Sequence, residues 1–89
     1  MKYRLKELEI WILEKFVSKR VWGTHHISEE DVHKGAPKRL RSQKRFRLVI
    51  RKTLKNLVSM GFMVSFPHKG TIHYHLNPAM RKEILEIIG

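Results

Sequence analysis

At 89 residues with 42% apolar side chains, the chain is expected to fold as one domain, residues 1–89, and its two Trp and four Phe argue against disorder. It has no cysteine, which excludes disulfides and thiolate-bound zinc. The net charge of +11 is concentrated in residues 32–82, which hold thirteen Lys and Arg and no acidic residue. Because such a block repels itself, it indicates a polyanionic partner, whose condensed counterions are released on binding.

The first predicted helix covers residues 4–20. Its inward stripe recurs at helical spacing and consists of Leu5, Leu8, Ile12 and Phe16. Further apolar residues lie on its other sides, so we expect burial on more than one face. The apolar run at the amino terminus is too short for a signal peptide or a membrane span, which predicts a cytoplasmic protein that makes no membrane contact.

A short β-prone stretch, residues 24–27, precedes a second helix. Ser28 is a good N-cap for this helix, and the three acidic residues at 29–31 favour the positive end of the helix dipole. Gly35 and Pro37 are expected to end it early.

The next predicted helix, residues 42–60, is the clearest amphipathic segment, with Ser42 as its N-cap and Gly61 after its end. Its apolar face comprises Phe46, Val49, Ile50, Thr53, Leu54, Leu57 and Met60. The opposite face is cationic, with Lys44, Arg51 and Lys55 at its centre and Arg41, Arg45 and Lys52 alongside. Leu48 lies within this basic face, as an isolated exposed leucine, a contact for a thymine methyl group, or a side chain covered by residues 35–41.

After Gly61 the apolar period changes from 3.6 to 2, which predicts a β-hairpin over residues 62–76. Its basic turn is Pro67-His68-Lys69-Gly70. The aromatic residues that we assign to the core are Phe46, Phe62, Phe66 and Tyr74. A last helix follows Asn77-Pro78, an N-cap and a proline at the first helical position.

This order of elements resembles the winged-helix (winged helix-turn-helix) domain of small transcriptional regulators in the multiple-antibiotic-resistance and arsenical-resistance families. The resemblance is carried by Leu54-Lys55-Asn56-Leu57-Val58-Ser59-Met60-Gly61-Phe62-Met63-Val64, where a leucine-rich helix end meets Gly and an apolar pair, and by His73-Tyr74-His75-Leu76. It implies an α+β fold with a three-helix core, a C-terminal β-hairpin wing and an additional C-terminal helix. Residues 35–41 are longer and more basic than the corresponding turn of these families.

In such domains the reading helix lies in the major groove of double-stranded DNA. The resemblance therefore implies that helix 42–60 binds DNA, in a sequence-specific or an architectural manner, as part of a transcriptional regulator. The residues expected to contact nucleic acid lie in the basic loop, on this helix and at the wing tip; they are Lys38, Arg39, Arg41, Gln43, Lys44, Arg45, Arg47, Arg51, Lys52, Lys55, His68 and Lys69. Base reading is assigned to Gln43, Lys44, Arg47 and Arg51, and backbone clamping to Lys38, Arg39 and Arg41.

Two alternatives stay open, an RNA-binding winged helix in a ribonucleoprotein and a protein-interaction module with an acidic partner. Exposed aromatic residues would favour RNA, and the core assignment of the four aromatic residues disfavours it. Catalysis is not expected, because the cationic stretch has no clustered carboxylates and the chain has no nucleophile elbow or phosphate-binding glycine loop. No cofactor is expected either.

Three histidines are expected to share the outer face of a small sheet, namely His26, His73 and His75, if Ile27 and Tyr74 point inward. The sequence offers them no cysteine and no nearby carboxylate as a fourth ligand, so we expect no metal site.

A homodimer is also expected, because the first helix has more apolar surface than one small core needs. Its interface is assigned to the first and last helices, through Ile10, Trp11, Leu13, Val17 and Leu85. The alternative is that the last helix folds back over the first helix and covers its second apolar side within one chain.

Overall fold

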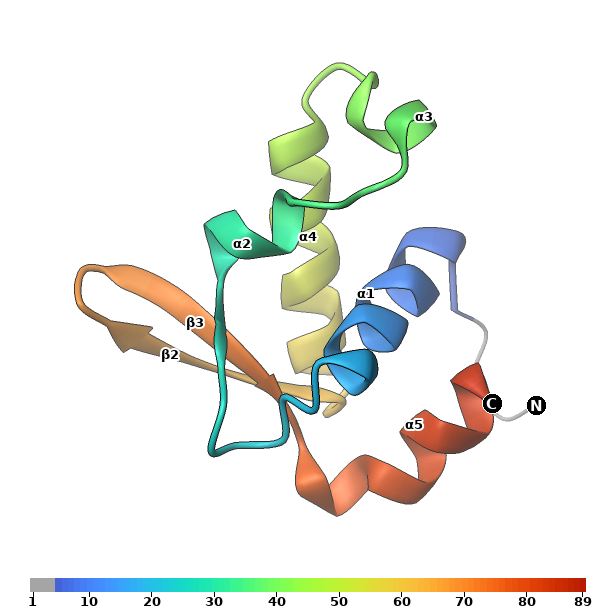
Figure 1. Cartoon of the computed structure of the whole chain (residues 1–89), viewed down its shortest axis with the longest axis vertical. Coiled ribbons are helices and arrows are strands. Elements are labelled where there is room, and N and C mark those ends of the chain that lie inside the picture. Colours follow the sequence, from blue (N-terminus) through green and yellow to red (C-terminus); the bar gives the residue numbers. More distant parts are fainter. Residues whose placement is uncertain (1–4) are drawn as a thin grey trace.

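The computed structural model describes residues 5–89 and shows an α+β fold, as the sequence predicts (Figure 1). Within these residues, five α-helices accompany a three-stranded antiparallel sheet of order β1-β3-β2. The elements are α1 (Glu7–Ser18), β1 (Ile27–Ser28), α2 (Glu29–His33), α3 (Lys38–Arg41), α4 (Phe46–Ser59), β2 (Met63–His68), β3 (Thr71–Leu76), the short 3-10 helix η1 (Pro78–Met80) and α5 (Arg81–Ile88). None of the helices in residues 5–89 has the length and apolar character needed to cross a membrane.

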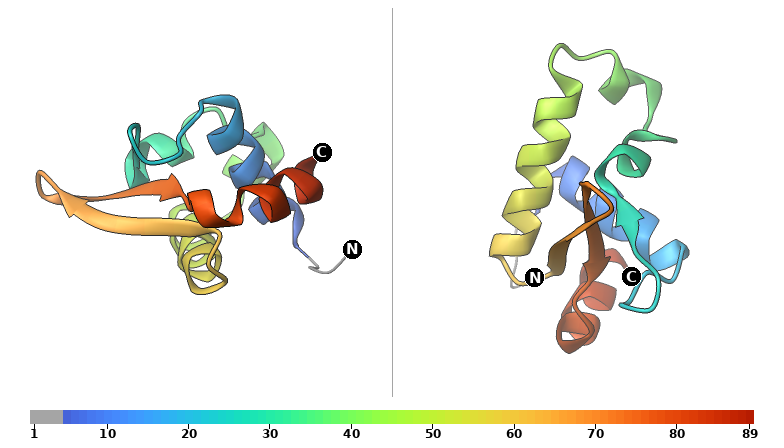
Figure 2. Two further views of the ribbon diagram at one scale, coloured as in Figure 1. Left: turned by 90° about the horizontal axis from the view of Figure 1, so that it is seen from below. Right: turned by 90° about the vertical axis from the view of Figure 1, so that its left-hand side faces the viewer.

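One apolar core joins the helices to the sheet. It is formed by Ile12, Leu13, Phe16, Val21, Val32, Ile50, Leu54, Leu57, Phe62, Met63, Tyr74, Leu76, Ile84 and Ile87. Helix α1 packs against α4, α5 and β3, and α4 packs against β2. The hairpin of β2 and β3 projects away from the helices, with α2 and the upper part of α4 on one side of it (Figures 1 and 2).

Helix α1 is shorter than predicted. It begins at Glu7, and the expected start at Arg4 lies outside the described residues. It ends at Ser18, before Gly23, because Arg20 adopts a left-handed conformation (φ 55°). The Val21 N–H then donates to the Phe16 carbonyl at 3.1 Å, which closes the helix in a Schellman-type turn.

Helix α2 begins as predicted, with the Ser28 hydroxyl accepting from the Asp31 N–H at 3.3 Å. It ends at His33, before Gly35 and Pro37, also as predicted. The one-turn helix α3 then forms within the basic segment, and it was not predicted from the sequence.

The predicted start of the long helix at Ser42 is wrong, because α4 begins at Phe46. Ser42 is instead the C-cap of α3: its N–H donates to the Lys38 carbonyl at 3.0 Å. Arg45 is left-handed (φ 61°) and breaks the chain between the two helices. The other end matches the prediction, since Gly61 (φ 85°) reverses the chain and the Phe62 N–H bonds the Leu57 carbonyl at 3.0 Å.

The hairpin has a tighter turn than predicted, made of Lys69 and Gly70 with φ of 48° and 82°. Positive φ at both central residues is the geometry of a type I′ turn, which matches the twist of the flanking strands. Pro67 and His68 therefore belong to β2.

The register of β2 also differs from the predicted alternation. Phe62 precedes the strand and is buried together with Met63, so the inward phase moves by one residue. Met63 pairs with Leu76 on the inner face, whereas Phe66 pairs with His73 on the outer face. The core assignment of Phe66 is therefore wrong.

The last helix starts as predicted, with the Asn77 Oδ1 accepting from the Ala79 N–H at 3.1 Å and Pro78 at the first helical position. The Asn77 Nδ2 also donates to the Gly61 carbonyl at 2.8 Å, which ties the end of the hairpin to the turn after α4. Helix α5 lies against α1 of the same chain.

Candidate nucleic-acid interface

Most of the basic residues between Lys34 and Lys55, where Lys and Arg are most frequent, are exposed and form no ion pair with a described residue. Of the ten Lys and Arg between Lys34 and Lys55, three form an ion pair: Lys34, Arg39 and Arg51. The other seven are exposed and make no ion pair with any residue from 5 to 89; they are Lys38, Arg41, Lys44, Arg45, Arg47, Lys52 and Lys55. This set is called the free cations below.

The structure places the residues assigned to base reading in two groups. Arg47 and Arg51 lie on α4, as expected. Gln43 and Lys44 do not, because α3 ends at Arg41 and the chain turns through Arg45 before α4 begins. Both lie in the connection ahead of the first helical turn, so their expected position on the helix is corrected.

The beginning of α4 is electrostatically unusual. Its N-cap, Arg45, gives no side-chain hydrogen bond, and its first turn contains no acidic residue. A helix amino terminus carries a partial positive charge and unpaired N–H groups, which acidic side chains normally offset. Here Lys44, Arg45 and Arg47 add further positive charge, so this end of the helix favours a negatively charged neighbour.

Arg51 forms an ion pair that was not predicted from the sequence. Its Nε and Nη2 lie 3.2 and 3.1 Å from Oε2 of Glu29 in α2, and the Tyr74 hydroxyl donates to Oε1 of the same carboxylate at 3.2 Å. Burial, followed by the charge and the hydrogen bond of Glu29, raises the pKa of Tyr74 to about 12. Glu29, which was assigned only to the helix dipole, therefore ties α2 to α4 and to β3.

Arg39 is held in a similar way, by an ion pair with Glu7 of α1. Helix α3 folds back beside α1, and the two helices line a groove of about 450 Å³ that includes Ile10, Trp11, Pro37 and Leu40. One of the expected backbone clamps is therefore engaged within the chain.

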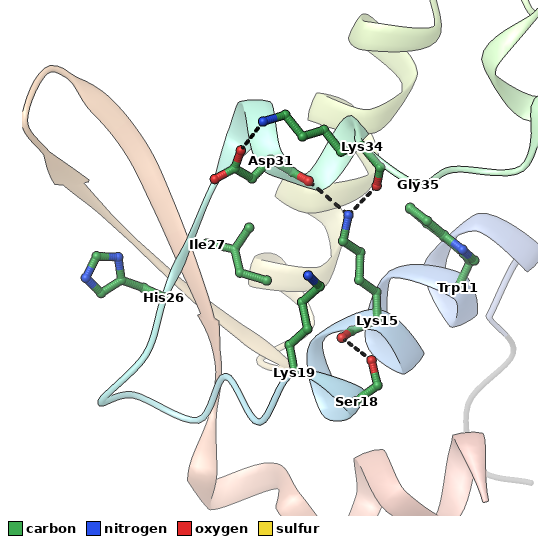
Figure 3. Close-up of a pocket in the computed structure, with 9 residues that line it drawn as sticks. All are labelled: Trp11, Lys15, Ser18, Lys19, His26, Ile27, Asp31, Lys34 and Gly35. Carbon is green, nitrogen blue, oxygen red and sulfur yellow. Dashed lines mark hydrogen bonds and ion pairs between the residues drawn. The ribbon is translucent and has the colours of Figure 1, made fainter.

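A larger cavity, of about 570 Å³, lies between α1, α2 and the segment before β1 (Figure 3). Its central cation is Lys15, whose Nζ donates to the carbonyls of Asp31 (2.9 Å), Val32 (3.2 Å) and Lys34. Desolvation, reinforced by the charge of Lys19, lowers the pKa of Lys15. Because Lys15 satisfies the last carbonyls of α2, its role in this cavity is structural.

The outer face of the sheet carries histidines together with Phe66. The pairing of Ile27 with Tyr74 confirms that His26, His73 and His75 share this face. The rings of His26, His68 and His73 lie edge-on to one another, with centroids 4.7 to 5.0 Å apart, and Phe66 lies 5.1 Å from His26. Within residues 5–89, no three His, Asp or Glu side chains are placed to hold a metal ion.

The hairpin tip holds the last two expected contacts. Lys69 is exposed in the turn, and His68 is half-buried within β2, where its ring belongs to the histidine group just described. Lys69 thus keeps its expected position, and His68 lies on the outer face rather than in the turn.

The residues assigned to a dimer interface differ in accessibility. Leu13 is fully buried in the core of a single chain, so its assignment to an interface is wrong. Ile10 and Trp11 line the groove beside α3, and the Lys15 ammonium lies 5.3 Å from the Trp11 ring. Val17 is half-buried and Leu85 is 39% exposed, which leaves these two for a contact through α1 and α5.

Comparison of the chain with protein-family models, with curated proteins and with solved structures found no match.

Proposed function

We propose that the protein is a winged-helix domain that binds double-stranded DNA, with α4 in the major groove and the hairpin of β2 and β3 as the wing. The order of elements and the β1-β3-β2 sheet support this proposal. So does the amino terminus of α4, where reading helices of this kind contact base edges. A transcriptional regulator is the corresponding biological role.

The observation that carries the proposal is the set of free cations. Lys and Arg side chains that serve folding are found beside carboxylates or carbonyls, as Arg39, Arg51 and Lys15 are. The free cations have no such partner among residues 5–89, and they follow one another along α3, α4 and the connection between them, whereas other exposed and unpaired lysines such as Lys69 and Lys82 lie apart from them. A polyphosphate backbone supplies the missing counter-charge.

The structure changes the roles assigned to individual residues. Arg47 is the strongest candidate for reading a base, because it lies exposed in the first turn of α4 and an Arg binds guanine in a bidentate manner. Lys44, Lys52 and Lys55 are assigned to phosphates. Leu48 is 56% exposed and is not covered by the basic loop, which leaves it free to contact a thymine methyl group.

A second candidate function, RNA binding, gains support from one observation. Phe66 is half-buried on the outer face of the sheet among imidazole rings, not in the core. Aromatic side chains on a solvent-facing sheet stack on unpaired bases in many RNA-binding domains. The argument against RNA therefore no longer applies to Phe66, whereas Phe46, Phe62 and Tyr74 do pack in or against the core.

One titration separates these functions. The intact chain is titrated with duplex DNA, single-stranded RNA and duplex RNA of equal length at two salt concentrations. Duplex DNA is expected to bind most tightly. Preference for single-stranded RNA would favour the second candidate, and no affinity for any of the three would favour an acidic protein partner.

A matched pair of variants locates the contact. Lys52→Gln and Lys82→Gln each remove one exposed, unpaired lysine from a helix, α4 and α5 respectively. Only Lys52→Gln is expected to weaken binding, because only α4 enters the groove. Equal weakening by both variants would mean that net charge, rather than this surface, determines binding.

A further inference from the structure

The outer face of the sheet contains a contact that links two histidines distant in sequence. His26 Nδ1 lies 2.8 Å from His73 Nδ1, and the His68 ring lies 5.0 and 4.9 Å from the His26 and His73 rings. These three residues are called the histidine cluster below. They come from the segment before β1, from β2 and from β3, so the fold itself brings them together.

The contact between the two Nδ1 atoms restricts how many protons the pair holds. At this distance one Nδ1 donates a hydrogen and the other accepts it, so a single proton lies between the two rings. A first additional proton binds the free Nε2 of the donor ring and leaves the contact intact. A second would have to bind the accepting Nδ1, and two imidazolium N–H groups would then face each other. The doubly protonated pair is therefore unstable unless an anion separates the rings.

The charged groups around the histidine cluster are mostly positive. Lys69 is exposed in the adjoining turn, and His75 of β3 lies beside Phe66 on the same face. On the other side, His26 lines the cavity of Figure 3 together with Lys15, Lys19, Lys34 and Asp31. Asp31 is the carboxylate that acts on His73, and it is already paired with Lys34 at 3.1 Å. No carboxylate of residues 5–89 bonds to a ring of the histidine cluster.

We infer that the histidine cluster binds phosphate groups of nucleic acid and takes up protons from solvent as it does so, which makes the affinity of the protein for a duplex increase as the pH falls below neutral. A phosphate oxygen accepts from both imidazolium N–H groups and replaces the contact between His26 and His73. Each proton moves from the buffer to a ring nitrogen, and no covalent bond to phosphorus forms or breaks. The inference rests on the proposed function and adds a second contact surface with its own regulation.

The electrostatics of the free protein support the direction of the effect. Desolvation, followed by the charges of His26 and His68, lowers the pKa of His73 from its usual value of 6.5. The surroundings of His73 therefore disfavour its charged form in the free protein. A bound phosphate would raise this pKa again, because a nearby negative charge favours the imidazolium, and proton uptake on binding follows from the difference.

The test is isothermal titration calorimetry of the intact chain with a DNA duplex near pH 6.5, in two buffers of different ionisation enthalpy. The difference in apparent heat gives the number of protons taken up. We expect net uptake by the wild type, and an affinity that rises by up to about tenfold per unit of pH for each proton. His26→Gln and His73→Gln are expected to reduce the uptake and flatten the pH dependence.

His25→Gln is the matched control, because His25 is an exposed histidine next to His26 and outside the histidine cluster. It is expected to behave as the wild type. His68→Gln provides a third test within the cluster, since His68 makes ring contacts only and its loss is the least disruptive to folding.

The outcomes separate two kinds of failure. Duplex binding with the same proton uptake in the wild type, the cluster variants and His25→Gln would overturn this inference and leave the proposed function intact. Absence of duplex binding at every pH would overturn the proposed function and this inference with it. Loss of uptake in the cluster variants alone, with circular dichroism unchanged, would support the inference.

Discussion

The molecule contains two populations of basic side chains that the sequence cannot tell apart. Lys15, Arg39 and Arg51 are engaged within the chain, with carbonyls of α2, with Glu7 and with Glu29. The free cations of α3 and α4 have no partner among residues 5–89, although they come from the same stretch of chain as Arg39 and Arg51. Both groups carry the same charge, so the sequence does not distinguish them. They differ in whether a carboxylate or carbonyl oxygen of the chain lies within bonding distance.

This difference between engaged and free cations indicates which basic side chains of the protein are candidates for binding a partner. Lys15 and Arg51 tie α2 to α1 and to α4, so substitutions there are expected to affect stability first, whereas the exposed ion pair of Arg39 with Glu7 contributes little. The free cations repel one another and make no ion pair within residues 5–89 that would offset this repulsion. Their removal should therefore change binding far more than folding, and each prediction below tests this separation.

The largest expected effect is that of salt on DNA binding. If about six of the seven free cations contact phosphates, log K should fall with log salt at a slope near −5, which is about a thousandfold between about 50 and 200 mM salt. Fluorescence anisotropy with a labelled duplex measures the slope. A slope shallower than about −2 would mean that the free cations do not face a nucleic acid.

The second-largest expected effect is the loss of self-association when the apolar contact on α1 is disrupted. A homodimer through α1 and α5 remains our prediction, with Val17 and Leu85 as its remaining apolar contacts. Sedimentation equilibrium at micromolar concentration should give twice the chain mass of 10.7 kDa for the wild type, and one chain mass for Val17→Glu. Because α5 already packs against α1 in one chain, the interface is smaller than the sequence indicates. A wild type with the mass of one chain would contradict the dimer.

Sequence patterns predicted which helices and strands form better than they predicted where these begin and end, or which strand residues face the core. The caps at Ser28 and Asn77 and the turn at Gly61 were predicted because each is specified within a few residues. The start of α4 could not be predicted in this way, since Ser42 suits the end of α3 as well as the beginning of a helix.

The outer face of the sheet shows why the candidate site was only partly predicted. The phase of β2 depends on how Phe62 and Met63 are both buried after Gly61, which is decided by packing against the core and not by alternation. Phe66 was therefore assigned to the wrong face. The basic segment could be recognised in the sequence, whereas the partners of Arg39 and Arg51, Glu7 and Glu29, lie at least 22 residues away in sequence and follow from the tertiary fold.

Arg47→Ala and Arg51→Ala should separate binding from folding within one helix. Arg47→Ala is expected to cost roughly 1–3 kcal/mol of affinity on a preferred site, less on random DNA, and almost no stability. Arg51→Ala is expected to lower the free energy of unfolding, because it leaves the Glu29 carboxylate with Tyr74 alone. Binding titrations and urea unfolding of both variants measure the two effects. Equal losses of affinity with unchanged stability would show that Arg51 also reads DNA.

Lys15→Ala tests an engaged cation of α1, which lies outside α3, α4 and the connection between them. It removes three hydrogen bonds to the end of α2, and we expect a loss of about 1–2 kcal/mol in the free energy of unfolding, because the site is partly exposed to solvent. The salt slope of DNA binding should stay that of the wild type. Lys19→Ala is the control, since Lys19 is exposed and makes no hydrogen bond with a described residue through its side chain. A slope reduced by about one unit in Lys15→Ala would place this lysine on a phosphate.

The smallest effect concerns Tyr74, whose hydroxyl donates to Oε1 of Glu29 while Arg51 donates to Oε2. Tyr74→Phe should cost about 1 kcal/mol of stability near neutral pH through the lost hydrogen bond. The pKa of Tyr74 is about 12 in the folded chain against 10.0 when unperturbed, so the unfolded state loses its proton first as the pH rises. The contribution of this hydroxyl is thus fully present below about pH 10 and disappears as the pH rises toward 12. Urea unfolding of the wild type and Tyr74→Phe at a series of pH values should show their difference shrinking across this window. A difference that stays constant would mean that Tyr74 ionises as readily in the folded chain as in the unfolded one, and that Glu29 is held by Arg51 alone.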